Sequence, residues 1–373
     1  MPSRRTTTEN LAEALRETYP ELTAIGAAAG DPVYLVGGAV RDLLLGRGRA
    51  DIDLAVVGDP ADLANALGAA TISEHERFAT AKVELEGHRV DIAGTRTETY
   101  PHPGALPAVS PAKSIEADLG RRDFSLNAMA IPLAAPLSLI DPYGGEADLE
   151  KGLLRALHPE SFRDDPTRAI RAARYAARFD FELEPGTEAL LRQADLGTVS
   201  EDRERAELLR LAAEPSAPRG FELLAGWGLI ELRDGGVALA AAVIELLRAD
   251  PWQGEAAKPE AVLKAALGPA GGESELAAAD PQRPSQAVEL ASAHGPVDLV
   301  LARALGATWL DEYLEAWRSV TLEIDGSDLL SAGVPEGPAM GRGLAAALRQ
   351  KLDGEISGYA AELAAAIEAA KNS

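Results

Sequence analysis

Asp51 and Asp53 are the residues of this sequence that most directly suggest chemistry. The run 52–57 is typical of a β-strand, and we expect Asp51 and Asp53, two apart, to lie on this strand with both carboxylates on the same face. Two carboxylates on one face suit Mg²⁺, which takes its other ligands from substrate phosphates and water. A third acid, Asp91, lies in a second strand-like run and could complete the cluster. We expect Asp51, Asp53 and Asp91 to be catalytic, with Mg²⁺ on Asp51 and Asp53. A solvated strand face is the alternative for Asp-x-Asp alone.

A glycine pair precedes these acids. The strand-like run 33–36 ends at Gly37 and Gly38, and residues 39–45 then have helical character. Glycines at such a turn let backbone N–H groups approach an anion, and a helix N-terminus adds favourable partial charge. Arg41 lies one turn into the helix, where it could contact a phosphate. An isolated Gly-Gly is usually an ordinary turn, but here the Asp pair follows within twenty residues.

Four arginines recur at helical spacing later in the chain. Arg168, Arg171, Arg174 and Arg178 are 3, 3 and 4 residues apart, so they form one basic stripe on a helix over 169–179. Asp165, followed by a proline, is a good helix start, because Asp caps helices and Pro is tolerated at the first helical position. From the residues alone, Asp165 could be only that cap, and the stripe could be a solvated face.

The candidate site residues lie on or next to segments that we expect to form a small sheet with helices. Strand patterns cover 33–36, 52–57 and 82–92, the last as two short strands around a turn at Glu86 and Gly87, and residues 39–45 and 61–69 are helical in character. Beyond about residue 149, helical patterns dominate at 169–179, 187–194, 203–213, 237–248 and 358–370, whereas 271–284 is loop-like. We predict an α+β protein with a small mixed-sheet head followed by an elongated all-helical neck, body and tail.

Composition narrows the class of protein. The 373 residues include no cysteine, which excludes disulfides and thiolate zinc sites, and carry a formal charge of −23. Such acidity argues against a non-specific coat on nucleic acid or membrane. Residues 151–220 are the exception, with 12 basic against 13 acidic residues. No apolar run is long enough to span a bilayer, and we expect a cytoplasmic protein without a membrane partner.

The motifs together resemble class II tRNA nucleotidyltransferases (CCA-adding enzymes) and bacterial poly(A) polymerases, within the DNA polymerase beta-like nucleotidyltransferase superfamily. The resemblance covers roughly residues 33–212. It is carried by Gly37-Gly38-Ala39-Val40-Arg41-Asp42 with Asp51-Ile52-Asp53, and by the segments 96–100, 121–130 (RRDFSLNAMA), 141–149, 163–168 (RDDPTR) and 201–208. A weaker tail match lies at 324–341. Asp164 departs from the family pattern, which more often has Glu there.

The resemblance implies site residues and an activity. Asp165 and Arg168 would hydrogen-bond the Watson–Crick edge of the incoming CTP or ATP. The other nucleotide-binding residues implied by the family are Gly37, Gly38, Arg41, Arg122, Asp123, Asn127, Arg171 and Arg174. With Mg²⁺ bound, the 3′-OH of tRNA would attack the α-phosphate and release pyrophosphate. The segment 101–118 occupies the place of the family's flexible loop, which favours an ability to add A.

The expected domains are a helical lead-in (1–28), a nucleotidyltransferase head (29–140), a neck that recognises the base (141–215), a body (216–300) and a tail (301–373). The expected function is addition of CCA to tRNA 3′ ends. The alternatives are a poly(A) polymerase, a narrower CC- or A-adding enzyme, and an inactive relative that only binds RNA or nucleotide. The oligomeric state stays open.

Overall fold

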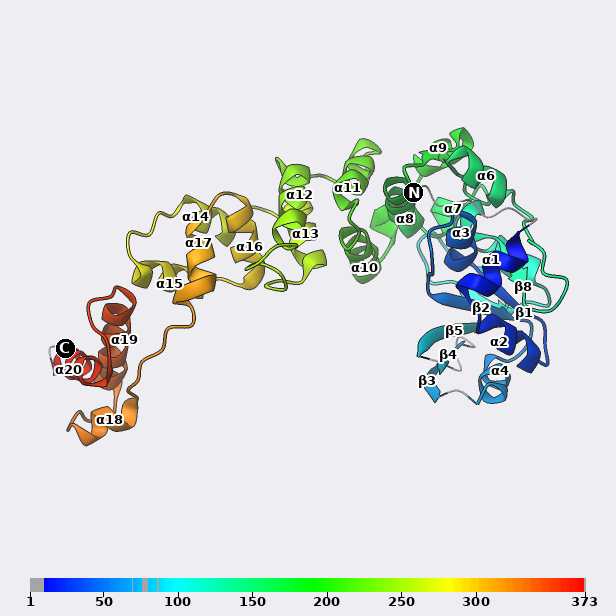
Figure 1. Ribbon diagram of the computed structural model, residues 1–373. Coiled ribbons are helices and arrows are strands. Elements are labelled where there is room, and N and C mark those ends of the chain that lie inside the picture. The colour runs from blue at the N-terminus through cyan, green and yellow to red at the C-terminus, as the bar shows by residue number, and fades with distance from the viewer. Residues whose placement is uncertain (1–9, 69, 76–79, 86, 372–373) are drawn as a thin grey trace. The chain divides into compact units, whose positions relative to one another are not determined.

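The computed structural model describes residues 10–68, 70–75, 80–85 and 87–371. Contacts divide the chain into two compact units. The first comprises residues 1–211 and 223–230, and the second comprises residues 212–222 and 231–373. The first holds all the strands and the second is helical (Figure 1). This confirms the predicted α+β class, while the five-part division of the chain stays a prediction.

A six-stranded mixed sheet forms the centre of the first unit. Its order is β3-β4-β5-β2-β1-β8. β2 pairs in parallel with β5, so that Asp53 lies opposite Asp91, whereas the other neighbouring strands are antiparallel. The strands are β1 (Val33–Val36), β2 (Ile52–Val56), β3 (Ala70–His75), β4 (Thr80–Leu85), β5 (His88–Gly94) and β8 (Ala130–Pro132).

Short helices surround this sheet. α3 (Gly38–Leu44) packs on β1 and β2, and α4 (Pro60–Ala66) packs on β4 and β5. Two N-terminal helices, α1 (Leu11–Thr18) and α2 (Leu22–Ala28), add their apolar side chains to the same core. A separate two-stranded ladder, β6 (Arg96–Thr99) with β7 (Ala108–Pro111), is followed by α5 (Ile115–Gly120).

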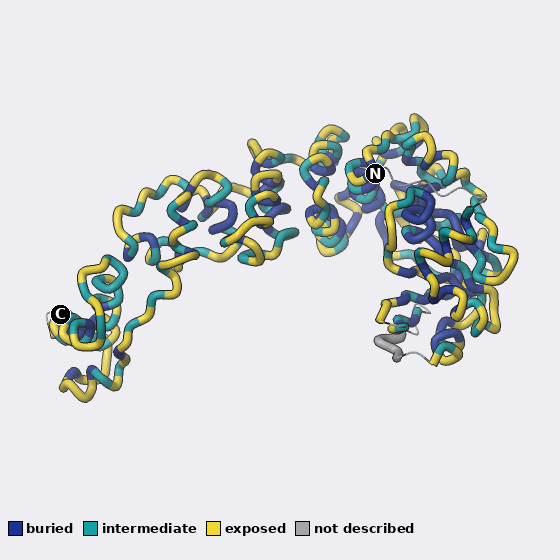
Figure 2. The backbone as a smooth tube through the Cα atoms, viewed as in Figure 1, coloured by how far each residue is buried: buried dark blue, intermediate teal, exposed yellow. Residues whose placement is uncertain are grey.

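The remainder of the first unit is mostly helical. It contains α6 (Gly145–Lys151), α7 (Ser161–Asp164), α8 (Thr167–Phe179), α9 (Pro185–Leu191) and most of α10 (Glu201–Ala212). A two-residue parallel pair joins β9 (Leu153–Leu154) to β10 (Glu182–Leu183). Buried positions are concentrated in the first unit around its sheet (Figure 2). α8 buries small and aromatic side chains, and Tyr175 and Phe179 join the core of the sheet. The helix that carries the arginine stripe is therefore fixed to the head by apolar packing.

The second unit has its own helices and core. After α11 (Ala217–Gly226), which contributes to both units, come α12 (Gly236–Leu246), α13 (Lys258–Leu267), α14 (Gly272–Ala278), α15 (Pro284–Ser292), α16 (Pro296–Ala304), α17 (Trp309–Glu312), α18 (Gly326–Ser331), α19 (Pro338–Leu352) and α20 (Tyr359–Lys371). Leu329, Ala347 and Ala366 are fully buried where α18, α19 and α20 meet. Among the described residues, none of the helices combines the length and apolar composition needed to cross a membrane.

Three sequence predictions need correction or qualification. The expected loop over 271–284 contains α14, because Leu276 supplies a fully buried anchor despite the flanking glycines. Asp51 was expected on a strand, but β2 begins one residue later, at Ile52. β4 and β5 are the two strands predicted over 82–92, although Glu86 of the expected turn lies outside the described residues.

Candidate active site

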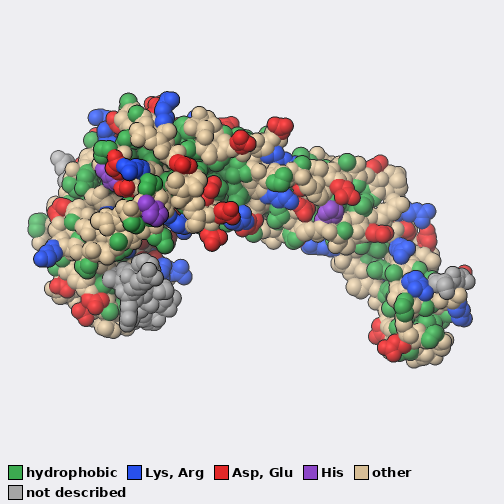
Figure 3. Space-filling model, turned by 180° about the vertical axis from the view of Figure 1, so that it is seen from behind, with side chains coloured by type: hydrophobic (Ala, Val, Ile, Leu, Met, Phe, Trp, Pro, Cys, Tyr) green, Lys and Arg blue, Asp and Glu red, His purple; other side chains and the backbone are tan. Residues whose placement is uncertain are grey.

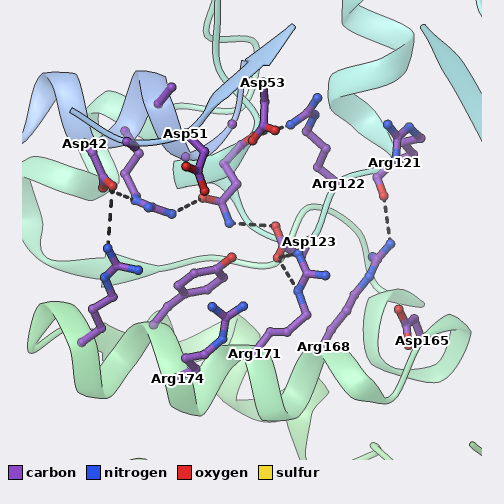
Figure 4. A pocket seen from close by; sticks show the side chains of 18 of the residues that line it. Asp42, Asp51, Asp53, Arg121, Arg122, Asp123, Asp165, Arg168, Arg171 and Arg174 are labelled. Carbon is purple, nitrogen blue, oxygen red and sulfur yellow. Dashed lines mark hydrogen bonds and ion pairs between the residues drawn. The ribbon is translucent and has the colours of Figure 1, made fainter. Parts of the chain in front are cut away.

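A large open cavity of about 1090 Å³ lies within the first unit, between the sheet and α8. Ten arginines and six acidic residues line it, so its lining is basic in a chain of formal charge −23. On the face of the molecule shown in Figure 3, by contrast, acidic and basic side chains are interspersed. We call this cavity the arginine pocket, its sheet side the head end and the opposite side the α8 end (Figure 4). Of the predicted site residues, Asp91 is the one outside its lining, which includes Gly37, Gly38, Arg41, Asp51, Asp53, Arg122, Asp123, Asn127, Asp165, Arg168, Arg171 and Arg174.

The glycine turn shapes the head end. Gly37 has a positive φ of 67°, a conformation that side chains disfavour. A Cβ atom on Gly37 would lie 2.9 Å from Nη1 of Arg122 and 3.9 Å from Oδ2 of Asp53. The missing side chain therefore leaves room for the Arg122 guanidinium, which points towards Asp53 (Figure 4). This is a specific reason for glycine at position 37.

The paired acids lie at the head end, but Asp91 has a different neighbour. Asp51 and Asp53 line the arginine pocket, whereas Asp91 lines a smaller adjoining cavity together with Asp53. Oδ2 of Asp91 accepts a hydrogen bond of 2.8 Å from Nζ of Lys82 on β4, and its Oδ1 is buried without a hydrogen-bond partner in the structure. Asp91 is thus beside Asp53 in the sheet, with one oxygen bound to Lys82.

The electrostatics of Asp53 suit a cation. Burial removes water from Asp53 and raises its pKa to about 6. The nearby carboxylates of Asp91 and Asp51 raise this pKa further, whereas the charge of Arg122 lowers it. A divalent cation would favour the charged carboxylate. Over the described ranges, no group of three or more His, Asp or Glu side chains is arranged to hold a metal ion. A pair of carboxylates that shares the ion with substrate phosphates fits Mg²⁺ better than a site made wholly of protein ligands.

The buried carboxylate of Asp118, on α5, holds two arginines of the pocket. Its Oδ2 accepts a 3.0 Å hydrogen bond from Nη2 of Arg122, and its Oδ1 accepts hydrogen bonds of 2.8 and 3.0 Å from Arg121. These arginines keep the pKa of Asp118 below its usual range despite its burial. Glu98 on β6 also accepts a 2.9 Å bond from Arg121. Two adjacent arginines are therefore held in fixed orientations before any ligand binds.

A chain of hydrogen bonds joins α8 to α3 across the pocket. Oδ2 of Asp123 accepts bonds of 2.9 and 2.6 Å from Nε and Nη2 of Arg171. Nδ2 of Asn127 donates to Asp123 at 3.0 Å, and Nη1 of Arg41 donates to Oδ1 of Asn127 at 2.7 Å (Figure 4). Arg41 completes the chain through a 2.8 Å bond to Asp42. The predicted nucleotide-binding residues Arg41, Asp123, Asn127 and Arg171 thus form one network.

The arginine stripe of α8 faces the pocket and not only solvent. Arg168, Arg171, Arg174 and Arg178 all line the cavity. The guanidinium of Arg178 lies 3.8 Å from Asp42, and that of Arg174 lies 4.8 Å from the ring centre of Tyr175. The purely solvated face considered for this stripe is therefore wrong.

Asp165 was expected as the cap of α8 with Pro166 at the first helical position, but α8 begins at Thr167 and Pro166 is its N-cap residue. The Asp165 side chain still bonds the first turn of α8 and makes a further contact. Its Oδ1 accepts hydrogen bonds from the backbone N–H and the hydroxyl of Thr167, at 3.2 and 2.6 Å, in the first turn of α8. The same oxygen accepts a 3.0 Å bond from Nη2 of Arg203 on α10. Nη1 of Arg203 donates at 2.7 Å to the carbonyl of Gly104, between β6 and β7. These contacts fix the direction of the Asp165 carboxylate at the α8 end.

Arg168 is buried and held by several acceptors. Nη1 donates to Oγ of Ser161 at 2.7 Å, and Nη2 donates to the backbone carbonyl of Arg121 at 2.8 Å. Nη1 also lies 3.3 Å from Nε2 of His158. Burial and the charge of Arg168 lower the pKa of His158, which favours the neutral ring that can accept this bond. The guanidinium therefore has a single preset orientation.

Sequence reasoning missed several residues of the site. Arg47 and Arg49 line the pocket but have no local spacing that marks them, and Tyr100, which also lines it, was quoted only within the segment 96–100. Arg203 and Arg121 were quoted only as members of motifs, because their contacts lie 38 and 47 residues away in sequence, at Asp165 and Arg168. Contacts between residues so far apart in sequence carry no periodic signal, so only the fold reveals such pairs.

Comparison with known proteins places this pocket in a family context. A family model described as the poly A polymerase head domain matches residues 33–155. An A-adding tRNA nucleotidyltransferase of Aquifex aeolicus is 45% identical over 174 residues, which are 45% of this chain and 21% of the relative. A CC-adding tRNA nucleotidyltransferase of Deinococcus radiodurans is 36% identical over 334 residues, or 85% of this chain and 84% of the relative. The match thus spans about a fifth of the first relative and most of the second.

Similarity to solved structures extends over nearly the whole chain. A Thermotoga maritima CCA-adding enzyme in complex with tRNA superposes with a TM-score of 0.71 at 27% sequence identity. The superposition covers 96% of this chain and 98% of that one. The fold of the helical second unit is therefore shared along with that of the head, although the poly A polymerase head model covers only residues 33–155.

Proposed function

The chain belongs to the class II tRNA nucleotidyltransferase family, and we propose that its arginine pocket adds CCA to the 3′ end of tRNA, as CMP and AMP from CTP and ATP. The observation that carries the proposal is the composition of this one pocket. At its head end the pocket has two acids that suit a cation, and ten arginines line the pocket as a whole. At its α8 end lie an oriented hydrogen-bond acceptor, Asp165, and an oriented donor, Arg168. A nucleoside triphosphate needs these three features together.

At the head end, Asp51 and Asp53 would hold Mg²⁺, and Arg122 beside Gly37 would contact the triphosphate. When bound, Mg²⁺ supplies charge neutralisation for the triphosphate and eases deprotonation of the attacking 3′-OH. The arginines held by Asp118 supply fixed positive charge where negative charge develops on the phosphates. Asp91, beside Asp53 on the neighbouring strand, remains the proposed third catalytic acid.

At the α8 end, Asp165 and Arg168 would read the edge of the base. A carboxylate only accepts hydrogen bonds and a guanidinium only donates them, so the pair complements a base edge that carries both an amino group and a ring nitrogen. Cytosine and adenine share that combination. The contacts of Arg203 and of Ser161 orient the two side chains without a nucleic-acid template. Arg174 would add charge near the phosphates, whereas Arg171 would act mainly by holding Asp123.

Two narrower activities have specific support among the relatives. The Aquifex relative is named as A-adding and the Deinococcus relative as CC-adding. The direct test is extension of tRNAs that lack CCA, CA or only the final A, with CTP alone, ATP alone or both. Full CCA synthesis on the shortest tRNA supports the proposal. Stopping after CC, or adding only the last A, would support a narrower enzyme.

Other results would reject the proposal altogether. Long homopolymeric A tails on any RNA would indicate a poly(A) polymerase, and no incorporation on any substrate would indicate a relative that only binds. Because the charge of the chain is −23 overall, we expect tRNA to be held by a small number of phosphate contacts near local basic groups. Binding should then weaken as salt rises, and a slope near zero would contradict this picture.

A further inference from the structure

The segment between α3 and β2, residues 45–51, contributes several of the residues that line the head end of the pocket. Arg47, Arg49, Ala50 and Asp51 all line the arginine pocket, yet the segment has no regular secondary structure. Gly46 and Gly48, with φ of 63° and 85°, give it little conformational preference of its own. Something outside the segment must therefore fix the position of Asp51.

The turn between α1 and α2 provides that support. The backbone N–H of Ala50, the residue before Asp51, donates a 2.9 Å hydrogen bond to the hydroxyl of Tyr19. Arg49 forms an ion pair with Glu21 and donates a 3.2 Å bond to the carbonyl of Thr18. Its guanidinium also lies 5.2 Å from the centre of the Tyr19 ring. Two consecutive residues of the segment are thus held by three residues where α1 ends and the chain turns into α2.

The side chains of Tyr19 and Glu21 that make these contacts are buried inside the first unit. Tyr19 is 0% exposed and Glu21 is 3% exposed. A buried carboxylate is costly unless it is paired, so Glu21 and Arg49 hold each other in place. Burial also raises the pKa of Tyr19, whose hydroxyl keeps its proton at neutral pH and accepts from Ala50 through a lone pair. Tyr19 belongs to the hydrophobic core of the first unit, so this support does not depend on a ligand.

We propose that Tyr19 and Glu21 are positioning residues of the active site, which direct Asp51 and Arg49 into the arginine pocket. The inference rests on the proposed function, in which Asp51 takes part in nucleotide transfer. It assigns a role to the N-terminal helices, which otherwise look like simple packing elements. Tyr19 acts through the Ala50 amide and touches no reacting atom.

The test compares Tyr19→Phe, which removes only the hydroxyl, with wild type and Glu21→Gln in the full-length chain. Tyr34→Phe is the matched control, because Tyr34 lies on β1 in the same unit and does not line the pocket. Hydrogen exchange of the peptide that spans residues 45–51 is measured by mass spectrometry. The kcat and KM for CTP are measured on a tRNA that lacks CCA, and thermal unfolding confirms that each variant is folded.

Loss of one hydrogen bond should speed exchange in the segment about fivefold in Tyr19→Phe. We expect kcat to fall by about the same factor while KM for CTP changes by less than roughly twofold, since the contact orients a reacting group and does not bind nucleotide. Glu21→Gln should change both quantities in the same direction, and Tyr34→Phe should match wild type. If Tyr19→Phe fails to fold, Glu21→Gln decides the question.

Two outcomes would overturn the inference. Exchange as slow as in wild type would mean that the turn does not hold the segment, and faster exchange with unchanged kcat would mean that holding it does not matter for transfer. A wild-type chain that adds no nucleotide would refute the proposed function instead. The exchange comparison would still decide whether Tyr19 fixes residues 45–51.

Discussion

The acidic residues at the head end of the arginine pocket and those at its α8 end differ in their charged neighbours. Asp53 has Asp51 and Asp91 as acidic neighbours, and its pKa is raised to about 6. At the α8 end, Asp123 is bound to Arg171 and Asp165 to Arg203. The head end is electrostatically incomplete without a cation, whereas the α8 end already has its charges paired. Under the proposed function, the chemistry would be assembled at the head end when substrate and metal bind, whereas base reading at the α8 end would be built into the fold.

The largest effect should come from the incomplete end. Replacing Asp53 by Ala should lower both CMP and AMP incorporation at least about a hundredfold, because metal-ion catalysis contributes several kcal/mol to the transition state. Single-turnover incorporation measures this, with Asp62→Ala, an exposed acid on α4, as the control. Near-normal incorporation by Asp53→Ala would break the assignment of chemistry to the head end.

The preset donor at the α8 end should give the next largest effect. Arg168→Lys keeps the charge but loses the planar fork that reaches Ser161 and the Arg121 carbonyl together. We expect kcat/KM for CTP to fall about tenfold, the value of a charged hydrogen bond. Arg192→Lys, an exposed arginine directly after α9, is the matched control. Equal kcat/KM for Arg168→Lys and wild type would show that the preset orientation is not used.

The paired charges at the α8 end also predict a pH dependence of stability. Burial alone would raise the pKa of Asp123, but the Arg171 charge and the Asn127 hydrogen bond lower it to about 2. A carboxyl whose folded pKa lies below its unfolded value of about 3.9 stabilises the fold at higher pH and loses that contribution as pH falls towards the folded pKa. The contribution at pH 7 is about 2–3 kcal/mol.

Denaturant unfolding of wild type and Asp123→Asn from pH 7 down to pH 3 measures this contribution. The difference in unfolding free energy should be largest near neutral pH and should shrink below about pH 4, as the wild-type carboxyl is protonated in the unfolded chain. A difference that grows on acidification would reverse the sign and contradict the pairing of Asp123 with Arg171.

The smallest expected effect concerns Arg203. Arg203→Lys can keep one of the two contacts, to Asp165 or to the Gly104 carbonyl, but not both with the same geometry. We expect the ratio of CTP to ATP use to change about threefold to fivefold, the value of one hydrogen bond. Arg210→Lys, an exposed arginine on the same helix, is the control. An unchanged ratio would limit Arg203 to a structural role.

The same contrast explains what sequence could reveal. The parts with a local pattern were predicted, namely the glycine turn, the acid pair at 51 and 53, and the arginine stripe on α8, which the structure brings together around one pocket. The parts that depend on contacts between distant segments were not. Arg203 meets Asp165 and Tyr19 meets Ala50 through the fold, and neither pair has a spacing that a helix or strand imposes.

Errors in the predicted elements have similar causes. α14 was missed because Gly271 and Gly272 at its start are typical of a loop, while the burial of Leu276 that stabilises the helix is a tertiary effect. β6 and β7 were missed because neither has a buried residue that would give it an apolar pattern, and each pairs only with the other. Asp51 was placed on a strand by its alternation with Asp53, although the strand begins at Ile52 and the turn of Tyr19 supports the residue before Asp51.

The division of labour within the pocket has one direct test, the ratio of kcat/KM for CTP to that for ATP in Asp53→Ala and Asp165→Ala. The proposed arrangement predicts that Asp53→Ala lowers both values while the ratio stays within roughly twofold of wild type, because the head end acts on the phosphates that the two nucleotides share. It predicts that Asp165→Ala still transfers nucleotide but changes the ratio at least about fivefold, through loss of a hydrogen bond to the base. A ratio unchanged in Asp165→Ala would contradict base reading at the α8 end.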